Sequence, residues 1–283
     1  MSAGVLAVGC VTSVGEDVAE VIAALKAGKT GMKDAPKGYP DPQLAQVPGP
    51  DLKLWLKRKK DARLLSRACQ LALPAAGRAM AAFAGDPETL GLYVAVGREP
   101  PDADDASLAI VAMERDGQLD LERLATRGRE LYPPLLPLRT LPNMILAHVS
   151  IQHGIRGENG TYTGGWSAGK QAVMAAIRAV DEGRVAFALA GGAHSNIDPF
   201  SAGDRWRVAA IERSFGRTDS EDPRYCPGEG AIFALIGPGG VPVDWESPLT
   251  EAWLQGCGDC GPVVGLAPLL AAGAHLGGPF AQA

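Results

Sequence analysis

Short apolar runs that end in glycine or turn residues recur along the chain and predict buried β-strands. The clearest is Leu92–Val96, because its β-branched and aromatic residues favour a pleated, buried surface. Strands are predicted at Val5–Cys10, Leu92–Val96, Val185–Ala190 and Ala231–Ile236. The glycine pair Gly191-Gly192 is expected to end the third of them.

Between these runs, apolar residues recur every three or four positions, which predicts helices packed on one face. Helices are predicted at Asp17–Ala27, Arg63–Phe83, Ala109–Leu131, Met144–His153 and Ala168–Ala179, and in the tail after Pro262. The helix Ala168–Ala179 carries so many alanines that close packing at the centre of the fold is expected. Strands that alternate with helices across glycine turns indicate an α/β fold with a mixed or parallel sheet.

Composition narrows the classes of function. The chain of 283 residues has 46% hydrophobic and 21% charged residues, as ordinary globular proteins do. Its net charge of −5 and pI of about 5.5 argue against nucleic acid or an anionic membrane as the main partner. No stretch approaches a membrane span, and the N-terminus lacks the basic residues of a signal peptide. Five cysteines favour a reduced, cytoplasmic setting.

The most informative segment is residues 157–172, which pass from strand-like residues through Gly164-Gly165 into the alanine-rich helix. A strand, a sharp turn and a helix N-terminus are a common setting for an activated cysteine or serine. Free backbone N–H groups and the helix dipole lower the pKa of a thiol there and hold an oxyanion. Trp166 stands where that nucleophile is expected. An indole has no titratable thiol, so the sequence predicts a site whose chemistry is gone.

Several segments in order resemble the β-ketoacyl synthases of the thiolase-like superfamily. They are Val8–Gly15 with Ala23–Gly31, Gly154–Gly157 with Asn159, Asp181–Gly183 with Leu189–Gly192, and Pro227–Ala231. The likeness covers residues 5–238. It implies a thiolase-like layered α/β/α fold with a near-complete N-terminal half and an abbreviated C-terminal half. We expect one truncated domain over 1–283, with the ketosynthase-like half at 1–238 and a remnant of the second half at 239–283.

The chain departs from this family at its reacting groups. In this frame the family's nucleophilic cysteine falls at Trp166. The family also carries two histidines in its C-terminal half. The region for the first has no counterpart here, and the position of the second falls near Cys257. The resemblance therefore implies no catalytic residue, no cofactor and no metal ion.

Each candidate residue has a plainer interpretation beside the functional one. Trp166 is expected to fill the former acyl cavity as a plug or to lie at an interface, the alternative being an ordinary surface aromatic. Ser167 is a candidate nucleophile, but serine at a helix start is more often an N-cap, and we expect a cap. Cys257 and Cys260 have C-x-x-C spacing; zinc or redox roles are conceivable, but two buried thiols are expected. His194 is expected in a loop, and Glu229 in a structural turn.

The resemblance also implies an interface. In the family, the strand that corresponds to Thr161-Tyr162-Thr163 lies at the dimer two-fold and pairs with the partner's copy. We therefore expect these residues, with Trp166, at a subunit contact of a homo- or heterodimer, the alternative being an internal strand.

Three functions follow from this sequence. The first is a catalytically inactive partner or scaffold subunit, similar to the chain-length factors that accompany an active ketosynthase and its acyl carrier protein. The second is a thiolase-like accessory or adaptor protein of a bacterial secretion system that binds a toxin effector. The third, least favoured, is an acyl-transfer enzyme that uses Ser167.

Overall fold

A computed structural model describes the chain except residues 1, 40, 101–102, 133, 206–225 and 277–283. Its centre is a five-stranded sheet in the order β1-β9-β8-β4-β7. The strands are β1 (Ala3–Val11), β4 (Gly91–Val96), β7 (Asn159–Thr163), β8 (Ala188–Ser195) and β9 (Glu229–Pro238). Strands β4, β7 and β8 are mutually parallel, whereas β9 runs antiparallel to both β8 and β1. The mixed sheet expected from the sequence is confirmed.

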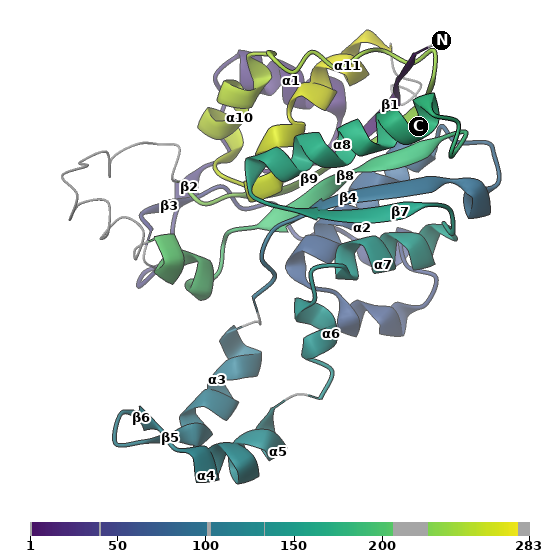
Figure 1. The fold of residues 1–283 in the computed structure, drawn as a ribbon. Coiled ribbons are helices and arrows are strands. Elements are labelled where there is room, and N and C mark those ends of the chain that lie inside the picture. The colour runs from purple at the N-terminus through teal and green to yellow at the C-terminus, as the bar shows by residue number, and fades with distance from the viewer. Residues whose placement is uncertain (1, 40, 101–102, 133, 206–225, 277–283) are drawn as a thin grey trace.

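Helices cover both faces of this sheet, which gives the layered α/β/α arrangement implied by the resemblance (Figure 1). One layer holds α1 (Val18–Lys26), α8 (Trp166–Asp181), α10 (Leu249–Cys257), the 3-10 turn η6 (Gly261–Leu266) and α11 (Pro268–His275). The other layer holds α2 (Arg67–Met80) and α7 (Met144–His153). Figure 1 shows α8 and α11 on one side of the strands and α2 and α7 on the opposite side.

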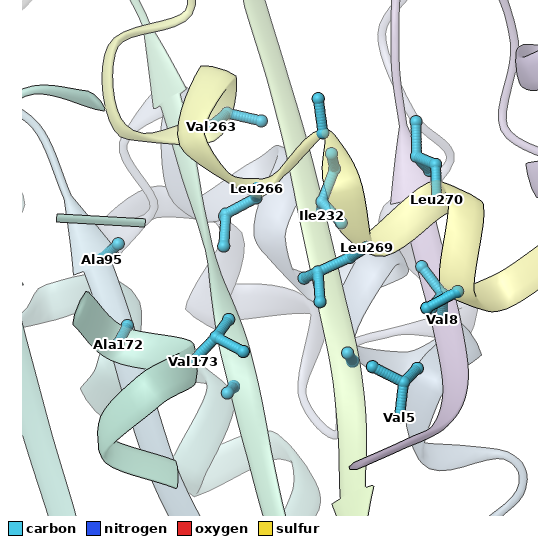
Figure 2. Close-up of a cluster of buried hydrophobic side chains, with 14 of the residues drawn as sticks. Val5, Val8, Ala95, Ala172, Val173, Ile232, Val263, Leu266, Leu269 and Leu270 are labelled. Carbon is cyan, nitrogen blue, oxygen red and sulfur yellow. The ribbon is translucent and has the colours of Figure 1, made fainter. Parts of the chain in front are cut away.

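The strands divide their side chains between two cores, because successive residues of a strand point to opposite faces. In β4, Leu92, Val94 and Val96 join the core under α2 and α7, whereas Tyr93 and Ala95 join the core under α8. Figure 2 shows the second core, where Ala172 and Val173 of α8 gather with Val263 and Leu266 of η6. The alanine-rich helix is thus packed at the centre, as predicted.

Side chains from residues 239–275 join this core, although the division of the chain at residue 238 stays a prediction. Leu249 and Trp253 of α10, Leu266 of η6 and Leu269 and Leu270 of α11 are all buried in it. Gly169 of α8 lies so close to η6 that an added Cβ would be 2.3 Å from the carbonyl oxygen of Pro262. The tail segment therefore packs against α8 at backbone contact distance.

Shorter elements complete the described chain. They are β2 (Lys33–Asp34), β3 (Gln43–Leu44), η1 (Leu52–Leu54), η2 (Lys59–Leu64) and η3 (Pro87–Thr89). A helical arm follows β4, consisting of α3 (Ala103–Met113), the hairpin β5 (Glu114–Arg115) and β6 (Gln118–Leu119), α4 (Leu121–Arg123), η4 (Leu124–Gly128), α5 (Arg129–Leu131) and α6 (Pro137–Thr140). Figure 1 shows this arm extending away from the sheet beyond α7.

Some expected boundaries were wrong. The helix predicted over Ala109–Leu131 is broken at the hairpin, where Asp116 (φ 55°) and Gly117 (φ 77°) adopt left-handed backbone. The predicted helix Arg63–Phe83 begins at Arg67, because Lys59–Leu64 forms a 3-10 turn and Ser66 caps α2. Helix α10 was not predicted from the sequence. Among the described residues, no helix is both long and apolar enough to cross a bilayer.

Candidate functional site

The turn between β7 and α8 has the geometry that the sequence predicted. Strand β7 ends at Thr163, two glycines follow, and α8 begins at Trp166. Gly164 (φ 136°) and Gly165 (φ 60°) both lie in backbone conformations that a residue with a Cβ rarely adopts. Gly165 is the N-cap of α8 and brings no capping side chain. The strand, sharp turn and helix N-terminus are therefore all present.

Trp166 is held at the surface of this turn. Its side chain is 40% exposed, and its Nε1–H donates to Oδ1 of Asp259 at 3.0 Å. In this chain the indole is thus partly exposed and bonded to a polar partner. Its expected role as a plug of the former acyl cavity stays a prediction. A role for Trp166 at a subunit contact stays a prediction.

Ser167 is not the N-cap that the sequence suggested, because Gly165 already takes that position. Ser167 lies in the first turn of α8, and its hydroxyl donates to the carbonyl oxygen of Gly164 at 2.9 Å. Its hydroxyl hydrogen is thus used within the glycine turn. A nucleophilic serine instead gives this hydrogen to a positioned base.

Asp259 organises the surroundings of Trp166, and sequence reasoning missed it. Its Oδ1 also accepts the backbone N–H of Gly261 at 2.8 Å. Its carbonyl oxygen accepts the amide of Asn196 at 2.9 Å and the backbone N–H of Gly228 at 3.0 Å. The resemblance placed the family's second histidine near Cys257, two residues before Asp259. That placement was the available signal that this segment lies beside the head of α8.

The thiols of this chain are not activated. Burial raises the pKa of Cys10 and Cys69 to about 12. It also raises the pKa of Cys226 and Cys257 to about 11 and that of Cys260 well above its usual value. All five cysteines are free. Cys257 and Cys260 are both buried, as expected, and no group of three or more His, Cys, Asp or Glu among the described residues is arranged to hold a metal ion.

His194 is linked to this site through Asn196 and lies in β8, not in the loop expected from the sequence. It is buried, and its Nε2 is 2.9 Å from Oδ1 of Asn196, whose amide nitrogen contacts Asp259. His148 and His153 lie on α7, in the layer opposite α8. Burial lowers the pKa of both of these imidazoles.

Glu229 has the structural role that was predicted. Its carboxylate accepts the backbone N–H of Val47 at 3.0 Å and the hydroxyl of Ser195 at 2.9 Å. It also forms a bidentate ion pair with Arg67, at 3.0 and 2.5 Å. The buried carboxylate therefore joins α2, β8 and β9 at one end of the sheet.

Thr161, Tyr162 and Thr163 lie on β7, at the edge of the sheet. They pair in parallel with Val94, Ala95 and Val96 of β4. Among the described strands, none pairs with the outer side of β7. The strand is thus at an edge and not internal, and its place at a subunit contact stays a prediction.

Residues 4–237 match the model of the β-ketoacyl synthase N-terminal domain. The chain belongs to this family. The match includes β7, the glycine turn and α8, so the described elbow lies inside the family's own domain. Among curated protein sequences, none is similar enough to this chain to be called a relative.

Three solved structures show the same fold at low sequence identity. The ishigamide ketosynthase/chain length factor is 21% identical, with a TM-score of 0.61 over 83% of this chain and 58% of that one. A type II PKS acyl-carrier protein in complex with its ketosynthase bound to the hexaketide is 17% identical, with a TM-score of 0.59 over 83% of this chain and 62% of that one. A β-ketoacyl synthase from Burkholderia phymatum STM815 is 18% identical, with a TM-score of 0.60 over 90% of this chain and 69% of that one. The chain thus spans less than two thirds of the length of the first two of these structures.

Proposed function

We propose that this β-ketoacyl synthase-like chain is catalytically silent and acts as the companion subunit of an active ketosynthase. The observation that carries the proposal is Trp166 at the head of α8, directly after the glycine turn. The free N–H groups and dipole of such a helix end assist a thiolate or an oxyanion, and an indole is neither. The strand, the glycine turn and the helix N-terminus are present, while an indole stands where the nucleophile is expected.

The neighbouring side chains support the same conclusion. A thiol with a pKa of about 11 carries almost no thiolate at neutral pH, so Cys257 and Cys226 are poor nucleophiles. The hydroxyl of Ser167 is bonded to a carbonyl oxygen, not to an imidazole. An acyl-transfer role for Ser167 therefore gains no support from its contacts. Five free cysteines agree with the cytoplasmic location that we propose.

The helical arm between β4 and α7 supports a function through a protein partner. Of the fifteen exposed large hydrophobic side chains among the described residues, eleven lie in this arm. They are Leu108, Ile110, Val111, Leu119, Leu121, Leu124, Leu131, Tyr132, Leu135, Leu138 and Leu141. So many exposed apolar side chains in one part of a chain are typical of protein interaction sites. The open edge of β7 offers a second place for a partner to pair.

The similar structures favour a companion role over the toxin adaptor. One is named as a ketosynthase/chain length factor and another as an acyl-carrier protein with its ketosynthase. We therefore propose a ketosynthase subunit as the partner, in a heterodimer. No contact or surface described above favours a secreted effector.

Co-purification tests the companion role. The chain is co-expressed with an active ketosynthase and its acyl carrier protein, and the complex is measured by light scattering. We expect a stable heterodimer that is weakened by the double substitution Leu108→Asp/Val111→Asp in the arm, because charge there opposes burial. Leu54→Asp, at a side chain that is 83% exposed outside the arm, is the matched control. A chain that stays alone, or that binds a toxin component instead, contradicts the proposal.

A second experiment tests catalytic silence. Trp166→Cys places a thiol at the head of α8, and we expect no condensation of acyl and malonyl thioesters by this variant. The reason is that, among the described residues, no imidazole makes a hydrogen bond at the head of α8, and the ring of His194 bonds to Asn196 instead. Mass spectrometry checks whether the new thiol is acylated, which separates loading from condensation. Steady ketosynthase turnover by the variant would overturn the proposal.

A further inference from the structure

His194 is an enclosed histidine near the end of β8, held between two glycine backbones. Its side chain is only 5% exposed. A Cβ added to Gly97, directly after β4, would lie 2.3 Å from Cε1 of the ring. One added to Gly261, at the start of η6, would lie 2.7 Å from Cδ2. The ring therefore has little freedom to turn away from the groups at its two nitrogens.

The hydrogen bonds around the ring decide the state of one of its nitrogens. The amide nitrogen of Asn196 donates to the carbonyl oxygen of Asp259 at 2.9 Å, which leaves Oδ1 of Asn196 as an acceptor. Nε2 of His194 lies 2.9 Å from that oxygen, so Nε2 carries a hydrogen and donates it. Asp259 also accepts the indole N–H of Trp166. The ring of His194 is thus connected to the elbow through Asn196 and Asp259.

The other ring nitrogen faces a carboxylate. Nδ1 of His194 lies 3.8 Å from Oε1 of Glu99, whose side chain is 6% exposed. Both atoms are enclosed by protein, and neither makes a hydrogen bond. In a neutral ring with its hydrogen on Nε2, Nδ1 is an acceptor, so two buried acceptors would face each other. A buried acceptor without a donor costs free energy, and a charged one costs more.

The arginines of this region have partners of their own. Three ion pairs lie nearby: Arg67 with Glu229, Arg98 with Asp204, and Arg205 with Asp41. Arg139 of α6 lines the same cavity as Glu99, and its charge favours an ionised carboxylate there. On α2, burial and, to a smaller extent, the charge of Glu99 raise the pKa of the Cys69 thiol to about 12, so this thiol stays neutral. Of the described residues, His194 is the one that makes an ion-pair contact with Glu99.

We propose that Glu99 and His194 hold a proton between them, so that the ring is an imidazolium in the folded chain at neutral pH. The proton comes from solvent and neutralises the pair. It gives Nδ1 a hydrogen and gives Glu99 a charged donor, and hydrogen bonds between charged groups are the stronger kind. A movement of about 1 Å closes their separation to hydrogen-bond length. This proton site is independent of the companion role proposed above.

The bound proton joins two segments that are far apart in the sequence. Glu99 lies between β4 and α3, where the helical arm leaves the sheet (Figure 1). His194 is connected through Asn196 and Asp259 to Trp166. Loss of the proton at high pH leaves two acceptors opposed, which loosens Glu99 from the ring. The base of the arm and the elbow should therefore respond to the same titration.

Nitrogen NMR of the full chain with ¹⁵N-labelled histidine rings tests the proposal. The sequence has four histidines, so their ring signals are assigned by substituting each with glutamine in turn. At neutral pH we expect His194 to show hydrogen on both ring nitrogens. His275, which is exposed, is the internal reference for a ring in water. As the pH is raised and His194 loses its Nδ1 hydrogen, the indole N–H signal of Trp166 should shift with it.

Two substitutions separate the contact with Glu99 from the general field of the site. Glu99→Gln keeps the shape of the side chain but removes its charge, and its amide can donate to Nδ1. We therefore expect a neutral ring of His194 with hydrogen on Nε2 alone. Asp198→Asn is the matched control, because Asp198 lines the same cavity and accepts the backbone N–H of Ser201. In this variant the ring should stay protonated.

A neutral ring of His194 in the unmodified chain at neutral pH would overturn the proposal, and that result does not depend on any variant. A ring that stays protonated in Glu99→Gln, or one that becomes neutral in Asp198→Asn, would show that the contact with Glu99 does not hold the proton. An indole signal that stays fixed while His194 titrates would contradict the coupling to the elbow. Thermal unfolding checks that each variant keeps its fold.

Discussion

The hydrogen bond from Trp166 to Asp259 joins the head of α8 to the segment before η6. We expect Trp166→Phe to lower the free energy of unfolding by about 1 kcal/mol. This is less than the 1.5–3 kcal/mol typical of hydrogen bonds to charged groups, since water reaches the indole.

A double-mutant cycle with Asp259→Ala, measured by urea unfolding, should return a coupling free energy of about the same size. Trp55→Phe in place of Trp166→Phe is the control, because Trp55 packs against Gly77 and Arg78 in the other core. Equal coupling for both tryptophans would contradict this contact.

At the residue scale, sequence reasoning located the elbow but not the partner of Trp166. The glycine pair, the indole and the alanine-rich helix are neighbours in the chain, so a pattern of residue types was enough to place them. Trp166 and Asp259 are 93 positions apart, and only the packing of η6 on α8 brings them together. The hydrogen bond of Trp166 therefore depends on a contact between distant segments, which local sequence does not reveal.

At the scale of elements, the contact between α8 and η6 depends on glycine. A Cβ on Gly169 would lie 2.3 Å from the carbonyl oxygen of Pro262, which is backbone and yields only if the segment moves. We expect Gly169→Ala to destabilise the fold by roughly 1–3 kcal/mol, although alanine favours a helix. Gly203→Ala is the control: this helical glycine is exposed with nothing near its added Cβ, so stability should be unchanged or higher by roughly 0.5–1 kcal/mol. Chemical unfolding decides, and equal effects at both glycines would contradict the close approach.

The strands show where pattern alone succeeds and where it fails. The four predicted runs all lie in or overlap strands of the sheet, because buried strands need continuous apolar residues. The predicted strand Val185–Ala190 stops too early, because Gly191 and Gly192 lie inside β8. A Cβ on Gly191 would lie 2.3 Å from the carbonyl oxygen of Ile232, and one on Gly192 would lie 2.5 Å from that of Ala95. These glycines serve close packing and not a turn, which local sequence does not distinguish.

For the whole molecule, the two histidines of α7, His148 buried and His153 partly buried, predict a dependence of stability on pH. Burial lowers the pKa of His148 and His153, so the folded chain holds them neutral at a pH where the unfolded chain protonates them. Below their ordinary pKa of about 6.5 the unfolded state therefore binds more protons, and stability falls as the pH falls. We expect this loss to set in as the pH falls through about 6.5, at up to ~1.4 kcal/mol per pH unit for each histidine. Paired carboxylates add their own losses mainly at lower pH.

Urea unfolding at a series of pH values measures this dependence, and two substitutions assign it. His148→Gln and His153→Gln each remove one proton-binding group, so each should flatten the slope even where it lowers stability at neutral pH. His275→Gln, at an exposed position on α11, is the matched control and should leave the slope in place. A slope that is the same in all three variants would show that α7 does not hold these imidazoles neutral. The packing of α7 against α2, which shields one layer of the sheet, would then be looser than the structure has it.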